Sequence, residues 1–162
     1  MSFQIRIEKD FLVFSAAHFI TFNGDVCERL HGHNYRVGVE LCGPLDENHY
    51  VMDFIAVRNA LKKIVDELDH HMLLPTEHTH IAVTADDQEV LVTFRDRRWV
   101  FPRADCILLP LPNTTSEKLA EYIGTRLIKA LAALGVTGIT ALSLEVDECF
   151  GQVGVWRLDS PF

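Results

Sequence analysis

The spacing of hydrophobic residues changes in a fixed order along this chain, and that order limits its fold. Apolar and polar residues alternate over residues 3–14 and again over 35–41, which indicates two half-buried strands. Two stretches with helical spacing follow, and then two further strand segments, 139–146 and 153–158. This order predicts an α+β fold, in which both helices cover one face of an antiparallel ββααββ sheet.

Both predicted helices have recognisable ends. Asp53 is a suitable N-cap for the segment 54–68, where apolar residues recur at helical spacing. The second helix starts at the cap residues of segment 114–116 and runs to Leu134, where Gly135 takes the position that glycine often has after a helix. We therefore expect two amphipathic helices between the two pairs of strands.

Two connecting segments have a less regular pattern. Residues 19–30 contain an Asn-Gly-Asp turn signal without a clean period, so a loop is predicted there. Residues 75–112 are too many for a structureless connection, and their β-forming segments 89–94 and 99–101 flank a charged turn, which predicts an inserted β-hairpin. We expect a single domain over residues 1–162, with this insertion at about 75–112.

Composition excludes some classes of function. The chain has 162 residues, of which 48% are hydrophobic and 23% charged, the balance of a globular protein. Its net charge of −8 opposes binding to nucleic-acid phosphates. Its longest uncharged stretch, residues 130–144, is too short and too rich in glycine to span a bilayer. We therefore expect neither nucleic acid nor a membrane as a partner.

Location and assembly can also be predicted. The first residues lack a basic segment followed by an apolar one, so a cytoplasmic location is expected. The four cysteines form no CxxC pair, and we expect them to be reduced. Four strands covered on one face leave two free edges and a bare face, which predicts a homo-oligomer.

Three histidines stand where they could share a metal ion. His18 ends the first predicted strand, and His31 and His33 lead into the second. Residues two apart in an extended segment point to the same side, and antiparallel pairing would bring His18 opposite them. Three neutral imidazoles with a vacant fourth position are the usual donor set of catalytic zinc. Because a His-x-His pair alone is weak evidence, the prediction depends on the third histidine.

Cys27 lies four residues before His31, and its spacing allows two interpretations. It could be a fourth zinc ligand that closes a structural site. It could instead stay off the metal, whose positive charge would lower the pKa of the thiol so that a thiolate can accept a proton. The sequence leaves both open.

Two further positions carry groups suited to proton transfer or recognition. Asp69 beside His70 could orient the imidazole and raise its basicity, although a histidine here could simply cap the preceding helix. Glu148 lies between the last two predicted strands, where its carboxylate could bind a guanidine-like edge through both oxygens. The alternative is that Glu148 is a solvated charge in a turn.

Five short motifs, taken in order, resemble the 6-pyruvoyl-tetrahydropterin synthase family. They are Phe14-Ser-Ala-Ala-His18, Cys27-x-x-x-His31-Gly-His33, Leu68-Asp-His70, Thr115-Ser-Glu117 and the C-terminal Glu148. The three residues between the cysteine and His-Gly-His are similar to the bacterial 6-carboxy-5,6,7,8-tetrahydropterin synthase branch, which serves queuosine biosynthesis. The pyruvoyl branch usually has a longer gap.

The resemblance implies a fold and a reaction. The fold would be a tunnelling fold, in which trimers close a barrel and two trimers stack into a hexamer. The enzyme would be a lyase that converts 7,8-dihydroneopterin triphosphate to 6-carboxytetrahydropterin, acetaldehyde and triphosphate. Two alternatives remain, namely another pterin side-chain lyase such as the pyruvoyl enzyme, and a non-catalytic pterin-binding zinc protein.

The resemblance also implies roles for individual residues. Lys118, where the family commonly has asparagine, and the long insertion both depart from the family pattern and leave substrate range and assembly open. The implied Zn²⁺ ligands are His18, His31 and His33. The implied catalytic residues are Cys27 as a base, Asp69 and His70 as proton donors, and Glu148, which would anchor the pterin and join the proton relay. Thr115, Ser116 and Glu117 would support the pocket.

Overall fold

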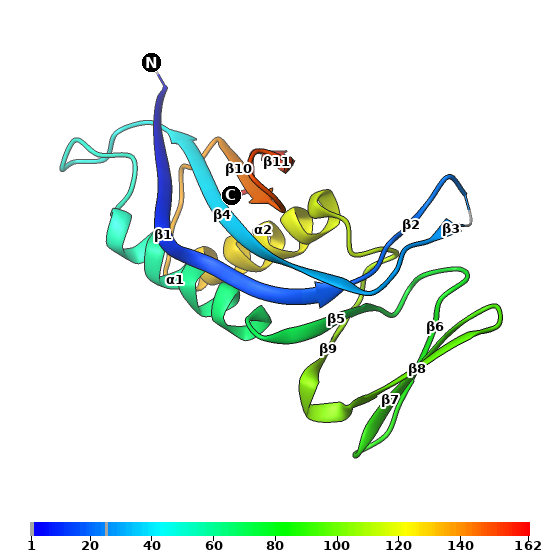
Figure 1. Cartoon of the computed structure of the whole chain (residues 1–162). Helices are drawn as coiled ribbons and strands as arrows, with labels where there is room; N and C mark the ends of the chain where they lie inside the picture. Colours follow the sequence, from blue (N-terminus) through cyan, green and yellow to red (C-terminus); the bar gives the residue numbers. More distant parts are fainter. Residues whose placement is uncertain (1, 25) are drawn as a thin grey trace.

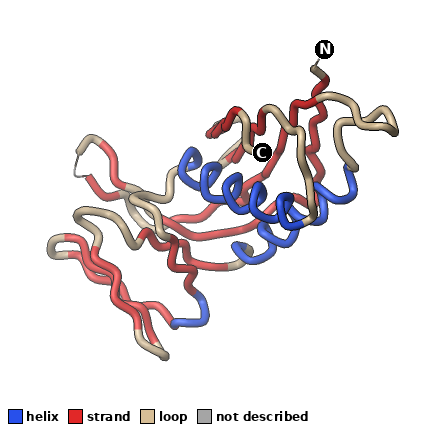
Figure 2. Tube along the Cα trace, turned by 180° about the vertical axis from the view of Figure 1, so that it is seen from behind, coloured by secondary structure: helices blue, strands red, loops and turns tan. Residues whose placement is uncertain are grey.

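A computed structural model describes residues 2–24 and 26–162. A six-stranded sheet with the strand order β11-β10-β4-β1-β5-β9 forms its centre, and two helices lie together across one face (Figures 1 and 2). The sheet strands are β1 (Phe3–His18), β4 (His31–Gly43), β5 (His71–Pro75), β9 (Cys106–Leu109), β10 (Ala141–Asp147) and β11 (Val153–Asp159), and the helices are α1 (Phe54–Leu68) and α2 (Ser116–Ala133). The predicted α+β class is confirmed.

The helices begin and end for the reasons that the sequence indicates. Asp53 Oδ1 accepts a hydrogen bond from Ile55 N at 2.8 Å and caps α1. Thr115 takes the same role for α2, accepting from Lys118 N at 3.4 Å, and Gly135 follows the helix with a positive φ of 79°. Each helix turns its apolar stripe to the sheet, so that the core lies between the two layers.

Strands β1 and β4 are the longest pair of the sheet and set the position of the site. They pair antiparallel from Phe3 opposite Gly43 to His18 opposite His31, with a register shift between Glu8 and Val13. Phe14 stacks on Tyr35 from the neighbouring strand with ring centroids 4.7 Å apart, and both side chains are fully buried. This packing fixes the two strands just before they reach the histidines.

The sheet is larger than predicted. Strands β5 and β9 extend it beyond β1, and both run parallel to their neighbours, with Ala16 opposite His71 and Met72 opposite Cys106. Their short apolar runs have no period that distinguishes a buried strand from other buried segments, so the sequence pattern did not reveal them. The expected four-stranded antiparallel sheet is therefore one side of a mixed sheet, from the edge strand β11 to β1.

The insertion contains more than the predicted hairpin. The hairpin strands β7 (Glu89–Phe94) and β8 (Arg97–Pro102) are joined by β6 (Ala82–Ala85) in a separate three-stranded sheet, and the short helix η1 (Arg103–Asp105) leads into β9. One face of this sheet packs on a second apolar cluster that includes Phe19, Met72 and Leu74. The insertion therefore has a core of its own beside the main one.

The predicted loop 19–30 contains a short hairpin. Strand β2 (Thr21–Phe22) pairs with β3 (Val26–Cys27), and the second long strand begins at His31 rather than at Tyr35. Figure 1 shows this hairpin and the insertion beyond the same end of the β1 and β4 pair. Neither helix of the described chain has the length and apolar character needed to cross a membrane.

Candidate metal centre

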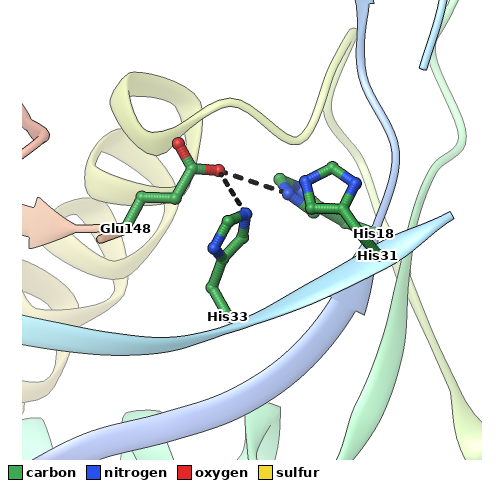
Figure 3. A group of neighbouring side chains, drawn as sticks. All are labelled: His18, His31, His33 and Glu148. Carbon is green, nitrogen blue, oxygen red and sulfur yellow. Dashed lines mark ion pairs between the residues drawn. The ribbon is translucent and has the colours of Figure 1, made fainter. Parts of the chain in front are cut away.

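Three histidines and a glutamate meet where β1 ends and β4 begins. His18 lies opposite His31 in the β1 and β4 pair, and His33 lies two residues further along β4, on the same side as His31. Glu148 follows β10 and points its carboxylate at this group (Figure 3). One ligand atom from each of the four residues lies within 4.8 Å of all the others. Two ligand atoms of a tetrahedral zinc site lie ~3.4 Å apart, so small side-chain movements would bring these four atoms to coordination distance.

Backbone carbonyls fix the orientation of two of the rings. His18 Nδ1 donates to Thr114 O at 3.0 Å, and His31 Nδ1 donates to Arg29 O at 2.8 Å. Because a carbonyl can only accept, the proton of each ring lies on Nδ1, and Nε2 keeps its lone pair. A histidine that binds a metal through Nε2 usually donates its Nδ1–H to a carbonyl or carboxylate in this way.

Burial keeps His18 neutral, as a metal ligand must be. Its side chain is fully buried, and this burial, ahead of all other causes, lowers the pKa of His18. Tyr35 Oη lies 3.1 Å from His18 Nε2, and burial likewise raises the pKa of the Tyr35 phenol. The two groups therefore face each other in their uncharged forms.

His33 supplies the observation that best tests whether a metal would fit. Its Nε2 is buried and has no hydrogen-bond partner, although it lies only 3.3 Å from Glu148 Oε1. Glu148 Oε1 is also 3.2 Å from His18 Nε2. A buried ring nitrogen without a hydrogen bond is costly, and a cation among these atoms would satisfy it. The donor set of three imidazoles and a carboxylate fits zinc.

The start of α2 contributes the residues around Glu148. Ser116 Oγ donates to Glu148 Oε2 at 3.3 Å, so that the two oxygens of this carboxylate face different partners. Thr115, Ser116, Glu117 and Glu148 line the same open hollow of about 430 Å³. The structure therefore places all four residues that were assigned to the pocket around one space beside the histidines.

Cys27 lies outside the group of four ligand residues. Its Sγ contacts Glu28 O at 3.5 Å, and its side chain packs against the second apolar cluster. Burial, the largest cause, raises the pKa of the Cys27 thiol, Arg97 opposes this shift, and Glu28 adds to it. The structural interpretation, in which Cys27 is the fourth ligand, is less consistent with this geometry, because Glu148 is the residue that approaches the imidazoles.

Asp69 and His70 lie on the other side of β1 from the histidines of β4. Asp69 Oδ2 is 2.8 Å from His70 Nδ1, and Asp69 Oδ1 accepts from Ser15 N at 2.7 Å. The Ser15 hydrogen bond, the largest cause, lowers the pKa of Asp69, and His70 lowers it further. His70 has a positive φ of 59° and an 80% exposed side chain, and it lines an open hollow of about 540 Å³ with His33.

Two residues near the centre were not singled out from the sequence. Glu28 Oε2 lies 3.9 Å from His31 Nε2, and the signal was its position between Cys27 and His31. Thr114 was regarded only as part of a helix cap, whereas its carbonyl accepts the hydrogen bond of His18. No periodicity could have identified that carbonyl, because the contact joins segments 96 residues apart.

Comparison with known proteins agrees with this geometry. The sequence profile described as 6-pyruvoyl tetrahydropterin synthase matches residues 6–154. A relative from Methanocaldococcus jannaschii, provisionally named a 6-carboxy-5,6,7,8-tetrahydropterin synthase, is 35% identical over 147 residues, which are 90% of each chain. The Aquifex aeolicus 6-carboxy-5,6,7,8-tetrahydropterin synthase is 31% identical over 113 residues, 69% of this chain and 63% of the relative.

A solved structure extends the likeness to nearly the whole chain. It is a variant of Plasmodium vivax 6-pyruvoyltetrahydropterin synthase, in which a glutamate described as a catalytic residue is replaced by alanine. The two chains are 28% identical, the match covers 98% of this chain and 99% of that one, and the TM-score is 0.90.

The fold and the matches define a lyase-type enzyme with a tunnelling fold, whose chemistry concerns pterins. The chain belongs to the 6-pyruvoyl tetrahydropterin synthase family. Its His and Glu group is a site that could hold a metal ion.

Proposed function

We propose that this chain is a zinc-dependent 6-carboxy-5,6,7,8-tetrahydropterin synthase. It would convert 7,8-dihydroneopterin triphosphate and water to 6-carboxytetrahydropterin, acetaldehyde and triphosphate. The observation that carries the proposal is the cluster of His18, His31, His33 and Glu148, in which His33 Nε2 is buried without a hydrogen bond. The names of the relatives from Methanocaldococcus jannaschii and Aquifex aeolicus favour the carboxy product.

In this proposal, His18, His31 and His33 hold the metal. Bound there, Zn²⁺ would supply Lewis acidity that acidifies the C–H and O–H groups of the substrate side chain. The carbonyls of Thr114 and Arg29 keep the lone pairs of His18 and His31 directed at the centre. These contacts preorganise the ligands before substrate arrives.

Cys27 is the proposed base for the substrate side chain. A thiol whose pKa is raised by burial needs a nearby positive charge to act at neutral pH, which is why its role depends on a loaded centre. Glu28 is a second candidate, since it lies 3.9 Å from His31 and a glutamate is called catalytic in the Plasmodium vivax enzyme. Replacing each residue separately distinguishes the two.

Asp69 and His70 are the proposed proton donors to the pterin ring. Asp69 holds His70 Nδ1 at 2.8 Å, which orients the exposed imidazole toward solvent and substrate. The pair lies on the β5 side of β1, and His70 lines the same hollow as His33, so within one subunit the pair and the histidines border a common, open space. A homo-oligomer, a trimer or a hexamer, would let a second copy complete each site, and we propose this assembly.

Glu148 is the proposed anchor of the aminopyrimidine edge of the pterin, supported by Thr115, Ser116 and Glu117. Its Oε1 also approaches His18 and His33, so binding the metal and binding the pterin compete for this carboxylate. A Glu148→Gln variant that keeps its zinc but loses affinity for the pterin supports the anchor role. Loss of zinc would instead make Glu148 a ligand.

Product analysis tests the function directly. The zinc-loaded chain is incubated with 7,8-dihydroneopterin triphosphate, and the products are identified by mass spectrometry. Acetaldehyde and 6-carboxytetrahydropterin support the proposal, whereas 6-pyruvoyltetrahydropterin without acetaldehyde identifies the other branch. Binding without turnover identifies a non-catalytic pterin-binding protein. A cytoplasmic location and a role in queuosine biosynthesis are part of the proposal and need tests in cells.

A further inference from the structure

The inserted sheet makes a direct contact with the backbone of Cys27. Arg97 begins β8, and its Nη1 donates a hydrogen bond to Cys27 O at 2.8 Å. The two residues are 70 positions apart in the sequence, so the contact exists only because the insertion folds against the short hairpin β2–β3.

Aromatic contacts hold the Arg97 guanidinium in place. Its Cζ lies 4.6 Å from the centroid of the Trp99 ring, a cation–π contact within β8. Trp99 in turn stacks on Phe19, with centroids 4.7 Å apart and an angle of 20° between the rings. Phe19 is buried and directly follows the metal-site residue His18. The insertion therefore contacts the segment between His18 and His31 at both of its ends.

The hairpin that carries Cys27 has little structure of its own. Among the described residues, its strands pair at Thr21 with Cys27 and at Phe22 with Val26, and Glu28 N donates one more backbone hydrogen bond to Ile20 O at 2.9 Å. Such a short hairpin is marginal without outside contacts. Asn113 Nδ2 and His78 Nε2 reach Thr21 and hold β2. On β3, the Cys27 carbonyl is held by Arg97.

We propose that Arg97 is a positioning residue, which fixes Cys27 and its neighbour Glu28 at the metal centre and makes the insertion part of the active site. This inference rests on the proposed function, since it assigns a role toward the proposed bases. In the described chain, no hydrogen bond or ion pair joins Arg97 to the four candidate ligand residues, so its effect would pass through the Cys27 backbone. Its positive charge also favours the Cys27 thiolate.

The contact can be tested with three variants of the full, zinc-loaded chain. Arg97→Met removes the charge and the hydrogen bond, and Arg97→Lys keeps a charged donor without the planar group that stacks on Trp99. Arg98→Met is the matched control, because Arg98 is the exposed neighbour on the same strand. Hydrogen exchange of the peptide covering β2 and β3 is measured together with zinc content, kcat and KM.

We expect Arg97→Met to exchange faster in this peptide and to lose about 10- to 100-fold in kcat, with little change in KM or zinc content. Arg97→Lys should recover part of both losses, and Arg98→Met should match the parent chain. If the β2–β3 peptide exchanges hydrogen at the same rate in Arg97→Met and in Arg98→Met, the inference is overturned. If the parent chain has no turnover, the proposed function fails, while the exchange measurement still decides whether Arg97 holds the hairpin.

Discussion

The candidate metal centre and the hairpin that carries Cys27 are held in very different ways. The histidines lie at the end of a long ladder from Phe3 opposite Gly43 to His18 opposite His31, with fully buried aromatic rings beside it. In the described residues, the hairpin has two paired positions and one further backbone hydrogen bond, from Glu28 N to Ile20 O, and side chains from other segments contact it. The difference teaches that the proposed metal ligands are placed by the main sheet, whereas the proposed bases are placed by contacts added around it.

The largest effect is expected from removal of a metal ligand. His33→Ala should abolish stoichiometric zinc binding and lower kcat at least about 1000-fold, because three ligands define the proposed site. His33 is half-buried on the long ladder, so the variant should still fold. Metal analysis and circular dichroism measure the two outcomes. Full zinc occupancy in the variant would contradict the ligand assignment.

The next largest effect should come from the proposed bases. Cys27→Ala should lower kcat about 100- to 10,000-fold while zinc stays bound, because general-base catalysis contributes on that scale. Glu28→Gln is the matched variant, and the larger of the two losses identifies the base. Full activity of Cys27→Ala together with loss in Glu28→Gln would move the role to Glu28. Loss of zinc from Cys27→Ala would restore the structural interpretation.

Matched core substitutions compare the two regions by stability. Val39 of β4 and Val92 of β7 are both buried, and alanine removes the same atoms from each. Val39→Ala should lower the free energy of unfolding of the whole domain by about 2 kcal/mol. Val92→Ala should loosen mainly the insertion and raise hydrogen exchange there and in β2–β3. Equal exchange profiles in the two variants would show that both regions unfold as one unit.

The smallest effect concerns Asp69, which the main sheet holds through Ser15 N. Its pKa is lowered on folding, so the unfolded chain binds more protons and stability rises with pH. The contribution is fully present above the ordinary carboxyl pKa of ~3.9 and is lost as the pH falls through the lower folded pKa. Asp69→Asn should cost below about 1 kcal/mol at pH 7, because the group is more than one-third exposed.

Denaturant unfolding of the parent protein and of Asp69→Asn, measured at several pH values, checks the sign of this pH dependence. The difference between parent and Asp69→Asn should be largest near pH 7. It should shrink as the pH falls below the ordinary carboxyl pKa of ~3.9 and through the lower folded pKa of Asp69. If the stability difference between the two proteins does not change with pH, the charge of the Asp69 carboxylate does not contribute to it. The hydrogen bond from Ser15 N would then stabilise the fold equally well with a neutral acceptor.

Much of the fold was predictable because it follows local patterns. The spacing of apolar residues and the caps at Asp53 and Thr115 located both helices, and the strand patterns located the four antiparallel strands β1, β4, β10 and β11. Strands β5 and β9 were missed because a short buried strand shows no period, and β6 because the insertion was interpreted as a simple hairpin. The five motifs were sufficient to indicate the family, because their residue types and their order are both specific.

By itself, the sequence determined which groups are available to the site. It placed His18 at the end of a strand and His31 and His33 two residues apart, and alternation alone puts the latter two on one side of their strand. Tertiary structure decided which groups meet: Glu148 approaches the imidazoles, Thr114 orients His18, and Arg97 holds Cys27. The local sequence determines the residue types and the hydrophobic period of each segment. The three contacts depend on how segments that are distant in the sequence pack together.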